Sequence, residues 1–125
     1  MSDYQFISVD DVIDIQKSIL AKAPVTNVGK LESGLKRAEQ YYYYDDEQNI
    51  VMLASYIILG VAKAHAFPDG NKRTAFLSGA YFLDINGYEI KETPEELANL
   101  VEALSSGRLE VKKFAAELAK FVFDG

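Results

Sequence analysis

The sequence predicts an all-α fold, and three observations lead to that prediction. Apolar side chains recur every three or four residues along most of the chain. Capping residues, Pro and Gly interrupt this spacing at intervals that suit six or seven helices. The chain has 125 residues, which is the length of one domain. We therefore expect residues 1–125 to form a single domain, a helical bundle around a buried central helix.

The first helix is predicted to begin at Ser8, where Ser8-x-x-Asp11 resembles a capping box. Its stripe contains Val12, Ile13, Gln16, Ile19 and Leu20. Pro24 is expected to end it, and residues 24–30 have the composition of a loop. A short second helix follows, marked by Leu31, Leu35 and Ala38. Tyr41 to Tyr44 cannot all face one way on a helix, so some should be buried and others exposed.

The clearest helical pattern spans residues 50–65. The face consists of Ile50, Leu53, Ala54, Ile57, Ile58, Val61, Ala62 and His65. His65 closes this stripe and is expected to point into the core. Pro68 and Gly70 then break the helix.

Residues 71–86 are apolar or small nearly all round, which is typical of a helix buried in the middle of a fold. Asn86-Gly87 should end this helix, and residues 88–90 should be extended. A capping box over residues 93–96 predicts a helix that Gly107 ends. A last helix should carry Val111, Phe114, Ala115, Leu118 and Val122.

Composition excludes several kinds of protein. No cysteine is present, which excludes disulfides and thiolate chemistry, and a single histidine excludes multi-histidine metal sites. The net charge of −6 disfavours direct binding of nucleic acid or anionic membranes. The N-terminus has no secretory-signal pattern, and no apolar run reaches the roughly 18 residues of a membrane span. A soluble cytoplasmic protein is expected.

The residue types that carry chemistry are concentrated between His65 and Thr74. The unpaired N–H groups at the start of the helix after Gly70 should attract an anion. Gly70 has no Cβ to hold an anion away from the backbone. Lys72 and Arg73 would reverse the negative charge of the chain locally, as phosphate binding requires.

Each of these residues also has a plain structural interpretation. A lone histidine is usually a packed core residue, and Asp69-Gly70-Asn71 is an ordinary turn. Lys72-Arg73 could be a solvated pair, although cations in the first turn oppose the helix dipole, which favours a function. A nucleotide-hydrolase phosphate loop is rejected because its first glycine and preceding strand are missing. A calcium loop is rejected because its later Glu is missing.

Taken together, the residues of this segment indicate one kind of protein far more specifically than any of them does alone. The string His-x-Phe-x-Asp-Gly-Asn-Lys-Arg-Thr-Ala, residues 65–75, resembles the signature of the Fic/Doc family. Residues 29–35 and 83–88 resemble the helix boundaries on either side, so the resemblance covers about residues 5 to 123. It implies a Fic-like helical bundle.

Two positions indicate the death-on-curing (Doc) branch. Lys72 stands where nucleotide-transferring Fic proteins have a glycine, and Phe76 stands where they have a second arginine. Ala66, where many relatives have Pro, is a minor departure. The branch is known for passing on the terminal phosphate of the nucleotide. The resemblance therefore implies a toxin with protein kinase activity, which uses ATP and Mg²⁺ and arrests translation by modifying a Ser or Thr hydroxyl of elongation factor Tu.

The resemblance also implies roles for individual residues. A general base, His65, would accept the proton of the target hydroxyl, which an imidazole can do near neutral pH. Asp69 would hold Mg²⁺. The expected catalytic residues are His65, Lys72 and Arg73. The expected nucleotide- and phosphate-binding residues are Phe67, Gly70, Asn71, Lys72 and Arg73.

Many Fic proteins inhibit themselves with a helix of the pattern [Ser/Thr]-x-x-x-Glu-[Gly/Asn]. Here Ser106 and Glu110 have that spacing, but Val111 stands where the pattern has Gly or Asn. A separate inhibitory partner is therefore expected. A separate antitoxin of the Phd type would then fold as an amphipathic helix into an apolar groove rimmed by cations. Lys30, Lys36 and Arg37 are the candidate cations. Two alternatives stay open: transfer of AMP or another nucleotide, and a catalytically idle domain that only binds its partner.

Overall fold

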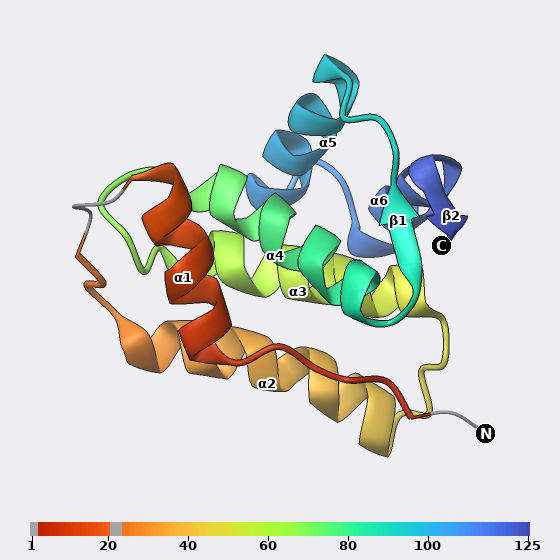
Figure 1. The fold of residues 1–125 in the computed structure, drawn as a ribbon, viewed down its shortest axis with the longest axis horizontal. Helices are drawn as coiled ribbons and strands as arrows, with labels where there is room; N and C mark the ends of the chain where they lie inside the picture. The colour runs from red at the N-terminus through yellow and green to blue at the C-terminus, as the bar shows by residue number, and fades with distance from the viewer. Residues whose placement is uncertain (1–2, 21–23) are drawn as a thin grey trace.

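The computed structural model describes residues 3–20 and 24–125 (Figure 1). The elements are α1 (Val9–Ile19), α2 (Val28–Tyr44), α3 (Ile50–Ala64), α4 (Asn71–Ile85), β1 (Tyr88–Ile90), α5 (Glu95–Ser105), α6 (Val111–Leu118), the 3₁₀ turn η1 (Ala119–Phe121) and β2 (Val122–Asp124). The predicted all-α fold is confirmed. Within residues 3–20 and 24–125, every helix is too short or too polar to span a bilayer.

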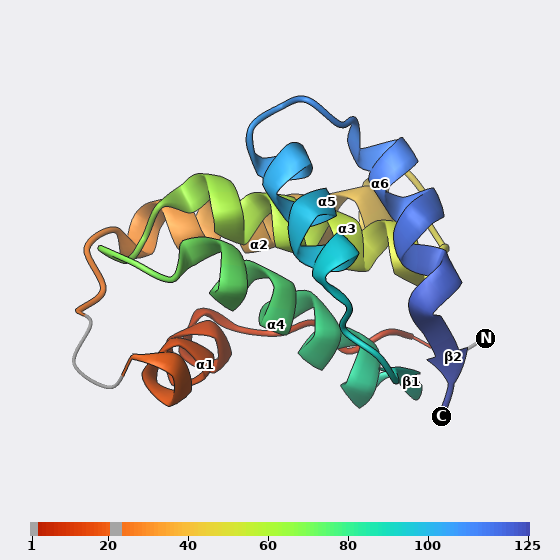
Figure 2. The ribbon, with the colours of Figure 1, turned by 90° about the horizontal axis from the view of Figure 1, so that it is seen from above.

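Helix α3 is the central helix, which corrects the expectation that residues 71–86 fill this place. It packs between α2 and α4, and α5 and α6 cover it from another side (Figures 1 and 2). Ten of its 15 residues are buried. Helix α4 is buried only along the face that contains Thr74, Ala75, Ser78, Gly79, Phe82 and Leu83. Its other face leaves Lys72, Arg73 and Tyr81 exposed.

Two glycines let α2 and α3 approach until their backbones touch. A Cβ built on Gly34 would lie 2.6 Å from the carbonyl oxygen of Gly60, and a Cβ on Gly60 would lie 2.6 Å from that of Gly34. Because real side chains do not pack that closely, both positions require glycine at this helix crossing. The crossing lies five residues before His65, the residue that follows α3.

The helix boundaries follow the capping residues, but those of α2, α5 and α6 differ from the prediction. Ser8 and Asp11 form the predicted capping box. Helix α2 begins three residues before the predicted position, because the side chain of Asn27 accepts a hydrogen bond from the N–H of Lys30. At 17 residues it is not short. Helix α5 begins at Glu95 after Pro94, and the expected capping box with Thr93 does not form.

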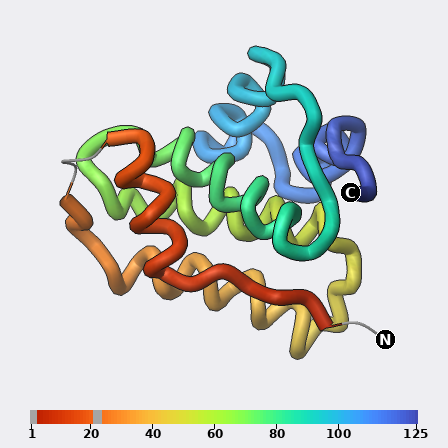
Figure 3. Tube along the Cα trace, in the orientation of Figure 1, coloured from red at the N-terminus to blue at the C-terminus, as the bar shows by residue number. Residues whose placement is uncertain are grey.

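The last correction concerns the C-terminal residues. Helix α6 ends at Leu118, and Val122 lies in β2 instead of the helix. Strand β2 pairs antiparallel with β1, the predicted extended piece, in the register Tyr88–Asp124 and Ile90–Val122. This pairing was not predicted, because two strands of three residues each carry too little pattern. The trace in Figure 3 shows the end of the chain beside β1, where the N–H of Gly125 donates to the carbonyl oxygen of Gly87 at 2.7 Å.

The tyrosine run divides between core and surface, as predicted. Tyr42 is buried, and Tyr41 stacks on Tyr56 of α3 with 3.9 Å between ring centroids. Tyr43 and Tyr44 are exposed. Core packing therefore accounts for the first half of the run.

Candidate active site

The candidate active site is built on the loop of residues 65–70, which joins α3 to α4. His65 is the C-cap of α3 and has a left-handed backbone, with φ of 45°. Its side chain is exposed. The expectation that His65 points into the core is therefore wrong, because the left-handed backbone turns the chain away from the path that the α3 stripe would follow. The imidazole is free to meet a substrate.

The start of α4 offers three unpaired donors. Gly70 is the N-cap, with φ of 75°, and has no side chain to cap the helix. The first N–H of α4 with an acceptor is that of Thr74, which donates to the carbonyl oxygen of Gly70 at 2.9 Å. In the part of the chain that the structure describes, the N–H groups of residues 71–73 have no acceptor. Together with the helix dipole they form an electropositive cradle for an anion.

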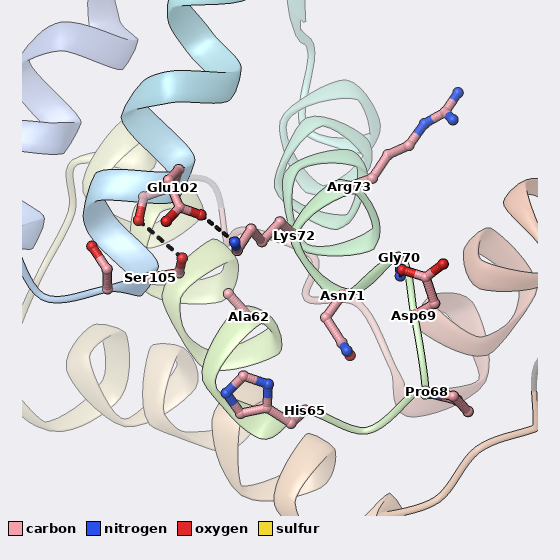
Figure 4. A pocket seen from close by; sticks show the side chains of 11 residues that line it. Ala62, His65, Pro68, Asp69, Gly70, Asn71, Lys72, Arg73, Glu102 and Ser105 are labelled. Carbon is pink, nitrogen blue, oxygen red and sulfur yellow. Dashed lines mark hydrogen bonds and ion pairs between the residues drawn. The ribbon is translucent and has the colours of Figure 1, made fainter.

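A cavity of about 450 Å³ opens over these donors (Figure 4). Its lining residues are Ala62, His65, Pro68, Asp69, Gly70, Asn71, Lys72, Arg73, Glu102, Ser105 and Ser106. The structure thus brings six of the seven predicted site residues to one cavity. The exception is Phe67, whose side chain is buried in the hydrophobic core. Because its N–H and its carbonyl oxygen are both hydrogen-bonded to the side chain of Asn71, Phe67 can contribute to the site only by anchoring the loop.

The side chain of Asn71 shapes the loop from inside. Its Oδ1 accepts a hydrogen bond from the N–H of Phe67 at 3.2 Å, and its Nδ2 donates to the carbonyl oxygen of Phe67 at 2.7 Å. Both ends of the amide are therefore occupied by the loop. Asn71 can serve an anion through its backbone N–H, while its side chain keeps the loop closed.

Lys72 does not stand free in the cavity. Its Nζ forms an ion pair with Glu102 of α5, and Arg108 lies 3.9 Å from the other carboxylate oxygen of Glu102. The hydrogen bond from Lys72, together with the positive charges of Lys72 and Arg108, holds the pKa of Glu102 below its ordinary value. The Lys72 ammonium is thus already neutralised by a carboxylate of the protein.

Arg73 extends away from Lys72 and His65 (Figure 4). A second cavity of about 510 Å³ adjoins the first and shares Lys72, Arg73 and Glu102 with it. Most of its other lining is apolar, with Phe76, Pro94, Leu97, Ala98 and Val101. The two cations therefore stand at the boundary between a polar cavity and an apolar one.

Asp69 is the residue that fits a metal ion. Its carboxylate is exposed in the cavity, and its Oδ1 accepts a hydrogen bond from the N–H of Gly70 at 2.7 Å. Within the described residues no three His, Asp or Glu side chains come together as a metal site. A lone carboxylate suits Mg²⁺, which is usually held by one or two carboxylates, phosphate oxygens and water.

Comparison with known proteins shows to which family the chain belongs. A model described as the Fic/DOC family matches residues 6–83. The chain belongs to the Fic/DOC family. The match includes α1 to α3, all but the last two residues of α4 and the whole His65–Thr74 segment, and it stops before α5. Glu102, Ser105 and Ser106 therefore lie outside the matched region, and no local pattern in the sequence marked them as site residues.

Two similar Fic/DOC relatives are Doc proteins. The chain is 28% identical to "Protein kinase doc" of Escherichia phage P1 over 96 residues, which cover 77% of this chain and 75% of the relative. It is 33% identical to "Toxin Doc" of Mycolicibacterium smegmatis over 70 residues, 54% of each chain. The predicted resemblance to the Doc branch is confirmed.

Proposed function

We propose that this Fic/DOC protein is the toxin of a type II toxin–antitoxin system. It transfers the γ-phosphate of ATP to a Ser or Thr hydroxyl of a translation factor, with elongation factor Tu as the expected target. Translation and growth then stop. The target places the reaction in the cytoplasm.

One observation carries this proposal: the three open N–H groups of α4 share a cavity with His65, Asp69 and Lys72. The helix start supplies donors for phosphate oxygens, and Lys72 and Arg73 supply positive charge for the transition state. The names of the two relatives, a protein kinase and a toxin, support the same reaction class. Lys72 and Phe76, which are typical of the Doc branch, support phosphoryl transfer over nucleotidyl transfer.

The residues of the chain divide the work. His65 accepts the proton of the target hydroxyl as its oxygen forms a bond to the γ-phosphorus. The bond from that phosphorus to the β–γ bridging oxygen breaks, and ADP leaves. The backbone of residues 70–73 orients the transferred group, and Lys72 and Arg73 stabilise its charge. Mg²⁺, when bound, neutralises phosphate charge, and Asp69 would hold it.

Alanine variants of the site test this proposal. We expect His65→Ala and Arg73→Ala each to abolish growth arrest and the transfer of label from γ-labelled ATP in a cell lysate. Both variants should keep the helical circular dichroism of the parent, because both side chains are exposed. Lys120→Ala, an exposed cation outside the cavity, is the matched control and should stay toxic. Full toxicity of a folded His65→Ala chain would contradict the assignment.

The antitoxin is proposed to be a Phd-like protein whose partner segment folds on binding. A small cavity of about 180 Å³ between α2 and α3 is lined by Lys30, Arg37 and Lys63, and no acidic residue lines it. Three cations in one groove of a chain of net charge −6 suit a partner with carboxylates. Lys36, the third candidate from the sequence, lies outside this lining and 3.9 Å from Glu32.

A further inference from the structure

A buried glutamine of α1 is hydrogen-bonded to the loop of residues 65–70 and to the first turn of α4. Gln16 is only 1% exposed, although the sequence places it in an apolar stripe. Its Nε2 donates a hydrogen bond to the carbonyl oxygen of Asp69 at 3.1 Å, and its Oε1 accepts one from the hydroxyl of Thr74. Both polar ends of the amide are thus satisfied by the segment that carries the site, as a buried amide requires.

These contacts fix the chain on both sides of Gly70. The carbonyl oxygen of Asp69 precedes Gly70, and Thr74 is the residue whose N–H closes the first turn of α4. Gly70 itself lies directly on the glutamine. A Cβ built there would meet Oε1 of Gln16 at 3.5 Å and Cδ1 of Leu20, the C-cap residue of α1, at 3.3 Å.

The other contacts of the loop act on its opposite end. Thr26 donates to the carbonyl oxygen of Ala66 through both its N–H, at 2.6 Å, and its hydroxyl, at 2.9 Å. Asn71 holds the backbone of Phe67. Among the described side chains, only that of Gln16 is hydrogen-bonded to the backbone of Asp69 from outside the loop. The Asp69–Gly70 peptide therefore depends on α1 for its orientation.

We infer that Gln16 is a positioning residue for the proposed reaction: through Asp69 and Thr74 it sets the direction of the Asp69 carboxylate and of the open N–H groups of α4. The inference rests on the proposed function, because it names the residue that orients that site. The peptide plane that carries the Asp69 carbonyl also carries the N–H of Gly70, which binds the Asp69 carboxylate at 2.7 Å. Rotation of this plane moves both groups together.

The test replaces Gln16 by Met, which is similar in size but cannot make either hydrogen bond. Ser55→Ala is the matched control, since Ser55 is fully buried and its hydroxyl binds Val51 within α3, outside the loop. We expect Gln16→Met to lower kcat/KM for phosphoryl transfer by about tenfold to a hundredfold. It should also raise the Mg²⁺ concentration at half-maximal rate, while the melting temperature falls no further than in Ser55→Ala.

A second readout does not depend on catalysis. Hydrogen exchange of the amides of Gly70 and Thr74, measured by NMR without nucleotide, should be at least about tenfold faster in Gln16→Met and unchanged in Ser55→Ala. A parent protein that transfers no phosphate would refute the proposed function, yet this exchange measurement would still decide the role of Gln16. Parental exchange rates or parental kcat/KM in Gln16→Met would overturn the inference.

Thr74 supplies a second pair of variants in case Gln16→Met does not fold. Thr74→Val removes the hydroxyl that binds Gln16, whereas Thr74→Ser keeps it. Loss of activity and faster exchange in the valine variant, with recovery in the serine variant, would support the inference. Equal behaviour of the two variants would overturn it.

Discussion

At the scale of single residues, the site contains backbone N–H groups that could bind an anion and a lysine that is already paired with a carboxylate. The N–H groups of residues 71–73 have no acceptor in the described structure, while Lys72 is paired with Glu102. In the proposed reaction, an incoming phosphate would therefore compete with a carboxylate for this lysine. Arg108, close to the same carboxylate, offers Glu102 another partner when Lys72 turns to the phosphate.

This competition predicts the effect of removing the carboxylate. The pKa of Glu102 is held below its ordinary value, so the side chain stays charged throughout the neutral range and releases Lys72 only as the pH falls through that lowered pKa. We expect Glu102→Gln to bind ATP roughly two- to fivefold more tightly at pH 7, as measured by calorimetry. Glu117→Gln, which breaks the exposed pair with Lys120, is the control and should bind as the parent does. Unchanged or weaker binding in Glu102→Gln would show that the carboxylate does not compete.

At the scale of secondary structure, the sequence predicted the features that depend on neighbouring residues and missed those that depend on distant packing. The motif residues could be predicted because eleven consecutive positions carry them, and the face of α3 because its spacing is regular. The left-handed turn at His65, the strand β2 and the contact of Glu102 with Lys72 depend on distant packing. No short window of sequence contains that information. The amide of Gln16 was missed for the same reason, since a helical stripe does not show what a buried polar group binds.

The crossing of α2 and α3 at Gly34 and Gly60 leaves no room for a side chain at either position. Gly60→Ala should lower the free energy of unfolding by about 1–3 kcal/mol, because its Cβ would overlap the backbone of Gly34. Gly29→Ala is the matched control, since its Cβ would meet only Asn27 at 3.8 Å and alanine favours a helix. Urea denaturation followed by circular dichroism measures both changes. Equal stability of the two variants would mean that the two helices do not cross at the glycines.

At the scale of the whole molecule, the cavity lies where the end of α3, the start of α4 and the end of α5 meet. The short sheet of β1 and β2 joins the end of α4 to the C-terminal segment, and α5 reaches over α3 to the cavity (Figure 2). Helix α5 contributes Glu102 and Ser105 to the cavity lining, and its C-cap residue contributes Ser106. The cavity thus combines a local motif with a helix that only the complete fold brings to it.

Binding of the proposed antitoxin to the whole domain can be tested in solution. If a partner segment folds onto the domain, mixing with the product of the adjacent gene should raise the melting temperature and give a large negative heat-capacity change. Added helix should appear in circular dichroism. Reversing charge at Lys30 and Arg37, which line the groove between α2 and α3, should weaken this binding, whereas Lys120→Glu should not. Absence of binding at micromolar concentration would refute the regulatory part of the proposal.

The central claim is that the terminal phosphate of ATP, and not the nucleotide, reaches the target hydroxyl. The most direct measurement incubates the purified protein with Mg²⁺, elongation factor Tu and ATP labelled on either the α- or the γ-phosphate, followed by intact-mass analysis of the target. We predict label from the γ-position alone and a mass increase of one phosphate, both absent with His65→Ala. Label from the α-position, with a mass increase of one AMP, would contradict the account.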